Sequence, residues 1–458
     1  MCSGSSNQKL NLINSLGVRK VINEQGFRQT PIGKIPEDWK TAKLGDICRF
    51  KRGFSYHSNQ ITKNSTNIRF ITINDFEKEG GLKQNSEKIF IKENINIDSE
   101  FFIKSGDVLI ANTDMSKGFI IGAPILIENL KSNVVYSMDL TKLIFNISRI
   151  DNKFLFYLLK HDKIRKKMKA FAQGTNVLHL NHDLVKNIKI PLPPLPEQRK
   201  IAEILSTVDD AIQKVSDAIA RTERLKKGLM QRLLTKGIGH NKFKFSKELG
   251  CEIPEEWEVV RLGDVCSVKT GPFGSQLKKE DLTTQGFKVY EQENVIHNDF
   301  KRGNDFIDPK KFESLKNFKV LPGDVLLTRV GSVGCAIVVP KDILPGIIGS
   351  RLLRIRSDKK TVHSHYLRSV LTSSFIQHQI AQSAHGATRK GLNTEIVKKF
   401  KIPLPPISEQ QKIAEILSTV DRKLELEKKR KEKLESIKKG LMNDLLTGRR
   451  RVKVDKDG

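Results

Sequence analysis

The sequence has no hydrophobic run long enough to cross a membrane, and it has few of the residues that disulfide-rich and zinc-binding folds need. It contains five Cys and two Trp among 458 residues, and no two Cys stand in a CxxC pattern. An odd number of Cys without metal-type spacing favours a reducing compartment over a disulfide scaffold. The first ten residues, MCSGSSNQKL, lack the apolar stretch of a signal peptide. These absences predict a cytoplasmic location.

Motifs that carry catalysis or bind nucleotides are also missing. The chain has no G-x-x-x-x-G-K-[ST] phosphate loop, no G-x-G-x-x-G after a predicted strand and no H-E-x-x-H. It also lacks the Asn/Asp-Pro-Pro-aromatic tetrapeptide of amino-methyltransferases, because both Pro-Pro pairs are flanked by Leu or Ile. The pairs His179 with His182 and His363 with His365 lack further ligands of metal-site quality, so we interpret them as surface histidines. We expect no catalytic residue, no metal site and no cofactor in this chain.

Positive charge is what the chain has in excess. Its 81 Lys and Arg against 52 Asp and Glu give a formal net charge of +29. Such an excess indicates a polyanionic partner. Nucleic acid is favoured over an anionic membrane surface, because no amphipathic segment is rich in Trp. A basic protein without a polyanionic partner is the weaker alternative at this magnitude.

One long block of sequence occurs twice. Residues 189–209, KIPLPPLPEQRKIAEILSTVD, return as residues 401–421, KIPLPPISEQQKIAEILSTVD, with 18 of 21 positions identical. The register then holds through a variable middle, because KKGLMQRLLT at 226–235 and KKGLMNDLLT at 438–447 keep the same offset of 212 residues. The variable middle therefore has a fixed length, which indicates a structural constraint.

Each repeated block predicts one long helix with an apolar seam. A helix from Glu197 to Thr235 would be roughly 58 Å long at about 1.5 Å per residue, and it could not bury such a seam alone. Two seams of equal length favour an antiparallel coiled coil of the two copies over separate packing into two cores. The seam residues are Ile201, Leu205, Val208, Ile212, Val215 and Ile219 in the first copy and Ile413, Leu417, Val420, Leu424, Leu434 and Leu441 in the second.

A second repeated signature predicts the start of a domain before each helix. IPEDWKTAKLGDICRFKRG at 35–53 aligns with IPEEWEVVRLGDVCSVKTG at 253–271, and 10 of 19 positions match. The shared Pro, Trp and Gly-Asp predict a turn, an aromatic anchor and a second turn into a strand. Short β-type runs beyond this signature predict strands at 69–73, 108–111, 120–127 and 143–147, then a helix at 154–171; in the second copy they predict strands at 288–290, 325–328, 336–339 and 352–355, then a helix from 366 to about 383.

The repeats predict an α+β protein with two α+β domains separated by two long helices that form an antiparallel coiled coil. The arrangement would have an internal pseudo-two-fold repeat. The predicted segments are an arm at 1–33 with a helix around 10–21, a domain at 34–190, a helix at 191–236, a linker at 237–252, a domain at 253–402, a helix at 403–447 and a basic tail at 448–458.

Basic and polar loops interrupt both domains and differ between them. Arg, Lys, Asn, Gln, Ser and Thr side chains can read base edges, and Gly lets the backbone approach phosphate closely. Any one loop is as often a simple turn, so the set carries the prediction of DNA binding. The basic helix at 154–171 is a further candidate for phosphate contact or, alternatively, a solvated face. The candidates are Lys51, Arg52, Ser55, Asn74, Asp75, Asn112, Thr113, Lys117, Gln173, Thr175 and Asn176 in the first domain and Phe273, Ser275, Gln276, Gln292, Asn294, Thr328, Arg329, Ser332, Ser350, Arg351, Thr388, Arg389 and Lys390 in the second.

Taken together, the repeats resemble those of the specificity subunit of a type I restriction-modification enzyme. The resemblance rests on two I-P-E-[DE]-W…L-G-D signatures, two P-L-P-P-x-x-E-Q-x-K-I-A-x-I-L helices and two unlike domains, and it covers essentially the whole chain. It implies two target-recognition domains, each reading one half of an asymmetric bipartite site in double-stranded DNA. It also implies that the helix pair sets the half-site spacing and docks two methyltransferase subunits.

The resemblance assigns the chemistry to partner subunits. Restriction subunits would join the assembly, and those partners would use S-adenosylmethionine, ATP and Mg to methylate adenine or cleave DNA. Two alternatives remain open from the residues alone. One is an enzyme whose catalytic centre has no recognisable motif, and the other is a non-catalytic architectural coiled-coil protein that binds nucleic acid without reading its sequence.

Overall fold

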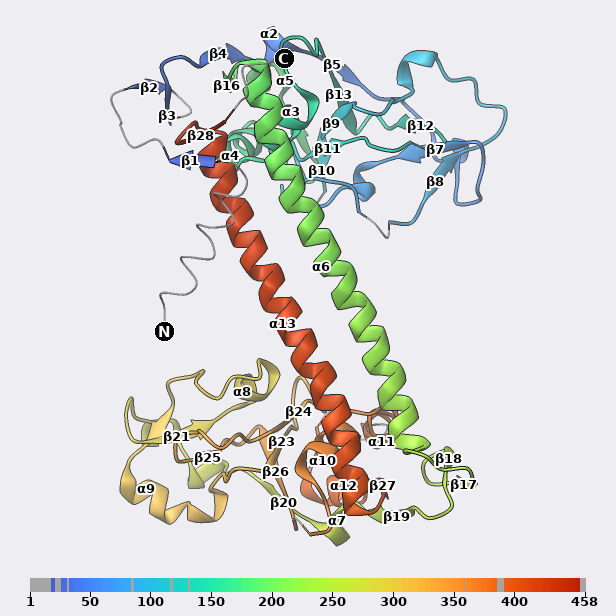
Figure 1. Ribbon diagram of the computed structural model, residues 1–458, viewed down its shortest axis with the longest axis vertical. Coiled ribbons are helices and arrows are strands. Elements are labelled where there is room, and N and C mark those ends of the chain that lie inside the picture. The colour runs from blue at the N-terminus through green and yellow to red at the C-terminus, as the bar shows by residue number, and fades with distance from the viewer. Residues whose placement is uncertain are drawn as a thin grey trace. The chain divides into compact units, whose positions relative to one another are not determined.

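The structure is a computed structural model that describes residues 18–20, 26–30, 33–83, 86–115, 118–130, 132–358, 360–384 and 391–453. The chain divides into two compact units, one formed by Met1–Val215 with Arg430–Gly458 and the other by Ser216–Lys429. Each unit holds one α+β domain together with parts of both long helices (Figure 1). Within the described ranges, no helix is both long enough and apolar enough to span a bilayer.

The first unit is built on two four-stranded sheets. One is antiparallel, in the order β11 (Pro124–Leu126), β9 (Val108–Ala111), β13 (Leu140–Phe145) and β5 (Cys48–Arg52). The other has the order β12 (Asn133–Tyr136), β7 (Ile68–Ile71), β8 (Ile89–Ile91) and β6 (Ile61–Thr62), and its β12–β7 pair is parallel. A third sheet has the order β10 (Thr113–Asp114), β15 (Leu178–Leu180) and β14 (Ala172–Gln173).

The second unit repeats this scaffold. Its antiparallel sheet has the order β20 (Cys266–Thr270), β26 (Leu352–Ser357), β23 (Val325–Thr328) and β24 (Ala336–Val338). A second sheet has the order β22 (Phe306–Ile307), β21 (Phe287–Tyr290) and β25 (Gly346–Ile348), and its β21–β25 pair is parallel, like β7–β12. The predictions for 108–111 and 325–328 are confirmed to the residue. The strand predicted at 120–127 shrinks to β11, because the Asp114 carboxylate accepts the backbone N–H groups of Ile120 and Ile121 and holds them in a turn.

The helix at the end of each domain is divided, so the predictions of single helices at 154–171 and 366–383 are wrong. Helices α3 (Asn152–Lys160) and α4 (Asp162–Ala170) meet at His161, whose backbone is extended at φ −61° and ψ 133°. The His161 imidazole accepts the Lys163 backbone N–H at 3.4 Å and so caps the second helix. In the other unit, α10 (Ser364–Leu371) and α11 (Ser374–Ala384) divide at the equivalent place.

The two repeated sequence blocks meet as paired strands in each unit. In the first, β4 (Lys40–Lys43) pairs with β16 (Lys189–Leu192); in the second, β19 (Glu258–Arg261) pairs with β27 (Lys401–Leu404). Both pairs are antiparallel. The start of each domain is therefore fixed to the strand that leads into a long helix.

Short terminal strands complete the first unit. The strand β1 (Val18–Lys20) pairs antiparallel with β28 (Arg450–Val452), so the helix expected around 10–21 is wrong at 18–20, and its remaining residues lie outside the described ranges. The hairpin β2 (Phe27–Thr30) with β3 (Gly33–Pro36) precedes the first domain. The hairpin β17 (Phe243–Ser246) with β18 (Cys251–Pro254) precedes the second.

A buried Trp–Glu hydrogen bond anchors each domain to the first turn of a long helix. Trp39 Nε1 donates to Glu197 Oε2 at 3.0 Å, and Trp257 Nε1 donates to Glu409 Oε2 at 3.0 Å. Both indoles are at most 1% exposed. The second partner of the carboxylate differs between the units. Glu197 accepts two hydrogen bonds from the Arg451 guanidinium at 2.7 and 2.9 Å, whereas Glu409 contacts His240 Nε2 at 2.9 Å.

The long helices α6 (Leu195–Thr235) and α13 (Ile407–Leu445) run antiparallel within each unit (Figure 1). Asp209 pairs with Lys438 at 2.5 Å in the first unit, and Lys226 pairs with Asp421 at 2.5 Å in the second. These ion pairs join equivalent residues at the offset of 212. Gly237 and Gly448 follow the helix ends with positive φ, a conformation that glycine adopts without strain.

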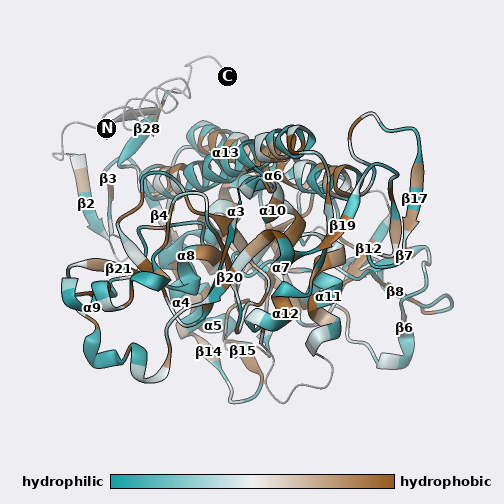
Figure 2. Cartoon of the chain, turned by 90° about the horizontal axis from the view of Figure 1, so that it is seen from below, coloured by the Kyte–Doolittle hydropathy of each residue, from teal (hydrophilic) through white to brown (hydrophobic). Residues whose placement is uncertain are grey.

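The apolar faces of both helices pack into the core of each domain. Hydrophobic and hydrophilic residues lie along both helices (Figure 2). In the first unit, Ile201 and Leu205 of α6 share one buried cluster with Leu441 of α13 and with α3. In the second, Leu233 and Ile413 share a cluster with α10. The seam residues therefore contact the domains as well as the other helix. Val208, Val215 and Leu417 are also buried. The remaining seam residues, Ile212, Ile219, Val420, Leu424 and Leu434, are half-buried.

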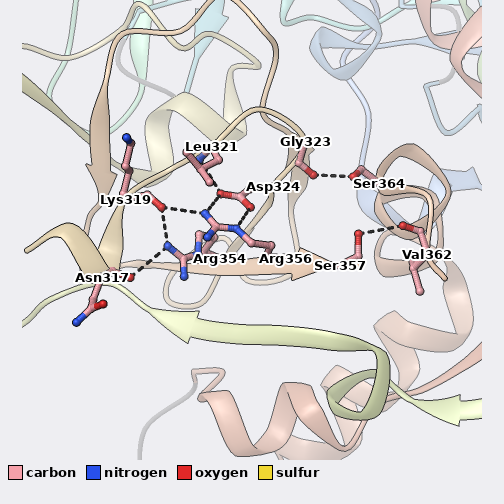
Figure 3. A network of polar contacts seen from close by, with 10 residues as sticks. All are labelled: Asn317, Lys319, Leu321, Gly323, Asp324, Arg354, Arg356, Ser357, Val362 and Ser364. Atoms are coloured by element: carbon pink, nitrogen blue, oxygen red, sulfur yellow. Dashed lines mark hydrogen bonds and ion pairs between the residues drawn. The ribbon is translucent and has the colours of Figure 1, made fainter. Parts of the chain in front are cut away.

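The repeated Gly-Asp turn before the central strand is structural in both units. Asp324 accepts two hydrogen bonds from the Arg356 guanidinium at 2.6 and 2.8 Å and one from the Leu321 backbone N–H at 2.7 Å (Figure 3). The bidentate pair raises the pKa of Arg356. Asp107 closes the equivalent turn by accepting the Lys104 backbone N–H at 2.9 Å. These Asp residues hold the strand that follows and are not free for other ligands.

The buried Trp–Glu bonds predict that each carboxylate stabilises its own unit. The chain has two Trp, so Trp257→Phe leaves Trp39 as the fluorescent reporter of the first unit. In that background, Glu197→Ala should lower the free energy of unfolding by about 2–4 kcal/mol, because the Trp39 N–H and Arg451 lose a buried acceptor. Urea denaturation followed by Trp emission measures the change.

The matched control is Glu203→Ala, which removes an exposed carboxylate from the same helix. It should change the free energy by less than about 0.5 kcal/mol. The reciprocal pair, Trp39→Phe with Glu409→Ala, should destabilise the second unit. Equal effects of Glu197→Ala and Glu203→Ala would contradict the anchoring role.

Candidate nucleic-acid interface

Two of the polar loops of the first domain meet around residues 137–139, and a third joins them through β15. Arg52 Nε donates to the Met138 carbonyl at 3.3 Å, and Asn112 Nδ2 donates to the same oxygen at 3.4 Å. Thr113 Oγ1 donates to the Asp139 carboxylate at 3.1 Å. Through β15, Thr113 and Gln173 both pair with His179. Segments that lie more than 100 residues apart in sequence therefore form one surface.

Burial separates the first-domain candidates into two kinds. Asp75, Asn112 and Thr113 are 2%, 4% and 6% exposed. The Asp75 carboxylate accepts the Thr72 backbone N–H at 2.9 Å, and Asn112 Oδ1 accepts Thr141 Oγ1 at 2.7 Å, so their polar atoms serve the fold. Lys51 is half-buried and pairs with Glu100. The exposed candidates are Arg52, Ser55, Asn74, Gln173, Thr175 and Asn176, and Lys117 lies outside the described residues.

The loops of the second domain surround a cavity of about 520 Å³. Its lining includes Phe273, Gln292 and Arg351 from three different predicted loops. A fourth loop joins them through Arg329, whose Nη1 donates to the Ser350 carbonyl at 3.2 Å and whose backbone N–H donates to the Arg351 carbonyl at 3.1 Å. The tertiary structure thus brings most of the predicted loops of this domain to one place.

The second-domain candidates are sorted by burial in the same way. Asn294 is 2% exposed, and its amide binds the Glu291 N–H and two backbone carbonyls. Thr328 is fully buried and donates to the Ser332 carbonyl. Gln292, Arg329 and Ser350 are half-buried. Phe273, Ser275, Gln276, Ser332 and Arg351 are exposed, and Thr388, Arg389 and Lys390 lie outside the described residues.

Equivalent glycines fix the start of the first polar loop in both domains. A Cβ at Gly53 would collide with the Ser137 carbonyl, and a Cβ at Gly271 would collide with the Gly349 carbonyl. Each glycine directly follows a strand of the antiparallel sheet, β5 or β20, so the loop leaves the same scaffold position in both units. The next two residues differ, because Phe54-Ser55 stands where the second domain has Pro272-Phe273. The scaffold is preserved while the exposed side chains change.

The basic helix α4 contributes one structural Arg and several surface Lys. Arg165 is 5% exposed and donates from Nη1 to the Ile121 carbonyl at 2.5 Å and from Nη2 to the Phe119 carbonyl at 3.1 Å. Burial lowers its pKa to about 10. Arg165 therefore holds the loop at 119–121, while Lys166 and Lys169 remain exposed.

Each unit also has a groove beside the long helices, and equivalent residues line both grooves. The first groove, of about 250 Å³, includes Ile212, Glu435, Lys438, Lys439, Met442 and Asn443. The second, of about 540 Å³, includes Leu424, Glu223, Lys226, Lys227, Met230 and Gln231, which are the same positions at the offset of 212. No sequence pattern indicated these grooves, because their walls come from both helices and from the domain helices α4 or α11.

The repeated cysteines and one of the paired histidines, His182, have structural surroundings, whereas His179 and His365 are exposed. Cys48 and Cys266 are buried in the cores, and burial raises the pKa of each thiol to about 12. His182 is half-buried, where burial lowers its pKa, and its Nε2 lies 2.8 Å from Asn112 Oδ1. Among the described residues, no cluster of three or more His, Cys, Asp or Glu could hold a metal ion.

Comparison with known proteins points to one family. The family model for the type I restriction modification DNA specificity domain matches residues 36–221 and again residues 254–436. The putative type I restriction enzyme MjaX specificity subunit of Methanocaldococcus jannaschii is 32% identical over 435 residues, which cover 94% of this chain and 98% of that relative. The MjaVIII specificity subunit of the same organism is 28% identical over 455 residues, which cover 95% and 98%.

The fold has a counterpart among solved structures. The S subunit of a type I restriction-modification system from M. genitalium matches with a TM-score of 0.59 at 18% identity, covering 89% of this chain and 96% of that chain. This likeness and the twofold match of the domain model confirm the predicted mixture of helices and strands with a repeated domain. The chain therefore belongs to the family of type I restriction-modification DNA specificity subunits.

Proposed function

We propose that each α+β domain of this specificity subunit reads one half of an asymmetric bipartite site in double-stranded DNA. The observation that carries the proposal is the pairing of a preserved scaffold with unlike loops. Gly53 and Gly271 start the first loop from equivalent positions, but the exposed side chains beyond them differ. Two domains with different exposed donors and acceptors would bind two different half-sites. The net charge of +29 supplies the attraction to phosphate that any such reader needs.

The chain itself is proposed to be non-catalytic. Methylation of adenine and cleavage of DNA would belong to partner methyltransferase and restriction subunits. Those partners, rather than this chain, would use S-adenosylmethionine, ATP and Mg. The expected cytoplasmic location follows from the same assignment and stays a prediction.

We further propose that the helix pair sets the distance between the half-sites. A continuous helix of 41 residues is about 60 Å long at 1.5 Å per residue, so its length could fix the spacing of two attached domains. Spacing matters because B-DNA turns once in about 10–10.5 base pairs, and a displaced domain would face the wrong side of the groove. The antiparallel pairs Asp209 with Lys438 and Lys226 with Asp421 support a fixed register between the helices.

The two equivalent grooves are the proposed docking places for two methyltransferase subunits. Both present Met and Ile or Leu beside a Lys pair, an amide and a Glu. Met adapts to the shape of an apolar partner side chain, and the charged rim would orient it. Because the long-helix walls of both grooves have the same residue types, one kind of partner would fit both, giving two copies per chain.

A direct test of half-site reading compares an exposed with a buried residue of the second domain. Arg351→Ala should change base preference in one half-site only, because Arg351 is exposed beside the cavity. The loss should be about 1–3 kcal/mol for the preferred base. Thr328→Ala, at a fully buried position, should lower stability and leave base preference intact. Selection of bound sequences from randomised duplexes, with the methyltransferase present at a stated salt concentration, measures both.

A gapped two-part motif from this selection would support the proposed function. Featureless binding that falls uniformly with added salt would instead favour a non-catalytic architectural protein that binds nucleic acid without reading it.

The spacing role predicts the effect of shortening both helices equally. Deleting residues 213–216 and 425–428, which are equivalent at the offset of 212, removes about 6 Å of helix. The preferred gap should shorten by about two base pairs, because base pairs are about 3.4 Å apart, while both half-site sequences stay the same. Replacing the same eight residues by Ala without deletion is the control. An unchanged gap in the selected sequences would refute the spacing role.

The docking role predicts how many methyltransferase subunits one chain binds. Lys227 and Lys439 are exposed and lie in equivalent positions of the two grooves. Lys227→Glu or Lys439→Glu alone should reduce the bound methyltransferase from two copies to one, and the double variant should bind none, as native mass spectrometry would show. Lys200→Glu with Lys412→Glu makes the same charge change at equivalent positions that do not line either groove. Retention of two partners in the double groove variant would exclude the grooves as docking sites.

A further inference from the structure

The cavity in the second domain combines hydrogen-bond acceptors with an apolar surface. It is about 520 Å³ in volume, and it opens among the loops proposed to read DNA. Its apolar part comes from Leu277, Leu282 and Val289, and Phe273 stands beside them with 60% of its surface exposed. Val289 is buried and the two Leu are half-buried, so Phe273 is the exposed ring that could stack against the face of a flat ring system.

Hydrogen-bond acceptors form one part of the polar lining. Gln292 Oε1 is shielded from solvent and has no hydrogen-bond partner among the described residues. Glu291, Glu293 and Asp305 add three carboxyl groups. A buried acceptor without a donor is costly, so the cavity is suited to a ligand that brings N–H groups.

Glu291 is the most enclosed of these carboxyl groups. It is half-buried, and its side chain lies against Gly349, where a Cβ would collide with it. Burial raises the pKa of this carboxyl group, and the nearby Arg351 partly opposes the rise. A ligand amino group could donate a hydrogen bond to Glu291 and so replace the hydration that burial removes from this carboxyl group.

Cations line the cavity as well. Lys278, Lys279 and Arg351 contribute to its lining, and Lys279 and Arg351 are exposed. An anionic backbone passing beside them would be attracted, while a phosphate placed among the three carboxyl groups would be repelled. The arrangement therefore suits a ligand with a flat, N–H-bearing body and an anionic attachment outside.

We propose that this cavity is a nucleobase pocket, which receives one base of the second half-site swung out of the duplex and favours a base with an exocyclic amino group. Stacking on Phe273 and hydrogen bonds to Gln292 and the carboxyl groups would hold the base, and the cations would hold its flanking phosphates. Proteins hold an extruded base by enclosing it between aromatic or apolar side chains and by hydrogen-bonding its edge. The proposal rests on the proposed reading of DNA by this domain.

The energetic signature of extrusion is a preference for a weakened base pair. Swinging out a base costs a few kcal/mol of stacking and pairing, and a mismatch removes part of that cost. Each position of the second half-site is therefore mismatched in turn by changing the opposite strand, so that the base offered to the cavity stays the same. We expect one position at which the mismatch strengthens binding by about tenfold, whereas mismatches elsewhere weaken it or leave it unchanged.

Variants of this chain, bound to its methyltransferase, connect that position to the cavity. Gln292→Ala and Phe273→Ala should each weaken binding to the matched duplex and abolish the gain from the mismatch. Gln285→Ala is the matched control, because Gln285 is an exposed amide of the same domain, does not line the cavity and is not among the residues proposed to read DNA. It should keep the full gain. A nucleobase analogue without the amino group, placed at the sensitive position, should reduce binding to the parent and have little effect on Gln292→Ala.

The outcomes distinguish a failure of the pocket proposal from a failure of the proposed function. A gapped motif with no mismatch-strengthened position would overturn the pocket and leave half-site reading intact. A strengthened position that persists in both Gln292→Ala and Phe273→Ala would place extrusion elsewhere and also overturn it. Absence of any gapped motif would instead defeat the reading of DNA itself.

Discussion

The hydrogen bond between a buried Trp and a Glu at the start of each long helix, buried at Glu197 and half-buried at Glu409, is the interaction on which the rest of the structure depends. Glu197 and Glu409 each accept the indole N–H of a Trp that begins a domain. An unpaired carboxylate is very costly to bury, so the domain, the helix and the closing Arg or His must assemble together. This requirement places the loops of each domain in a fixed relation to the first turn of its helix, which any site built on those loops needs.

The two units share this anchor but differ in the group that completes it. Arg451 forms two hydrogen bonds with Glu197 and two with Asp38, whereas His240 occupies the corresponding place beside Glu409. A guanidinium offers a planar fork of hydrogen-bond donors, whereas an imidazole offers only its two ring nitrogens. The repeat therefore preserves geometry more strictly than chemistry, and the same holds for the loops beyond Gly53 and Gly271.

Hydrogen bonding within the fold limits which polar residues can serve recognition. Asn112, Asn294 and Thr328 have side chains suited to reading bases, yet each is buried with its polar atoms bonded to neighbouring segments. Sequence cannot separate them from exposed residues such as Asn74 or Arg351, because both kinds are polar residues at or near the ends of short strands. The distinction comes from partners that lie 29 residues away for Asn112 and only a few residues away for the other two.

The sequence by itself determined the repeat, the long helices, the domain starts and most strands, because periodicity and turn residues act over a few neighbouring positions. It missed the break at His161, where one side chain caps the next helix. Only the tertiary structure decided which loops meet, which candidates are buried, and that residues from four segments enclose a cavity beside Gln292. Those features depend on contacts between distant segments, whose closeness no local pattern records.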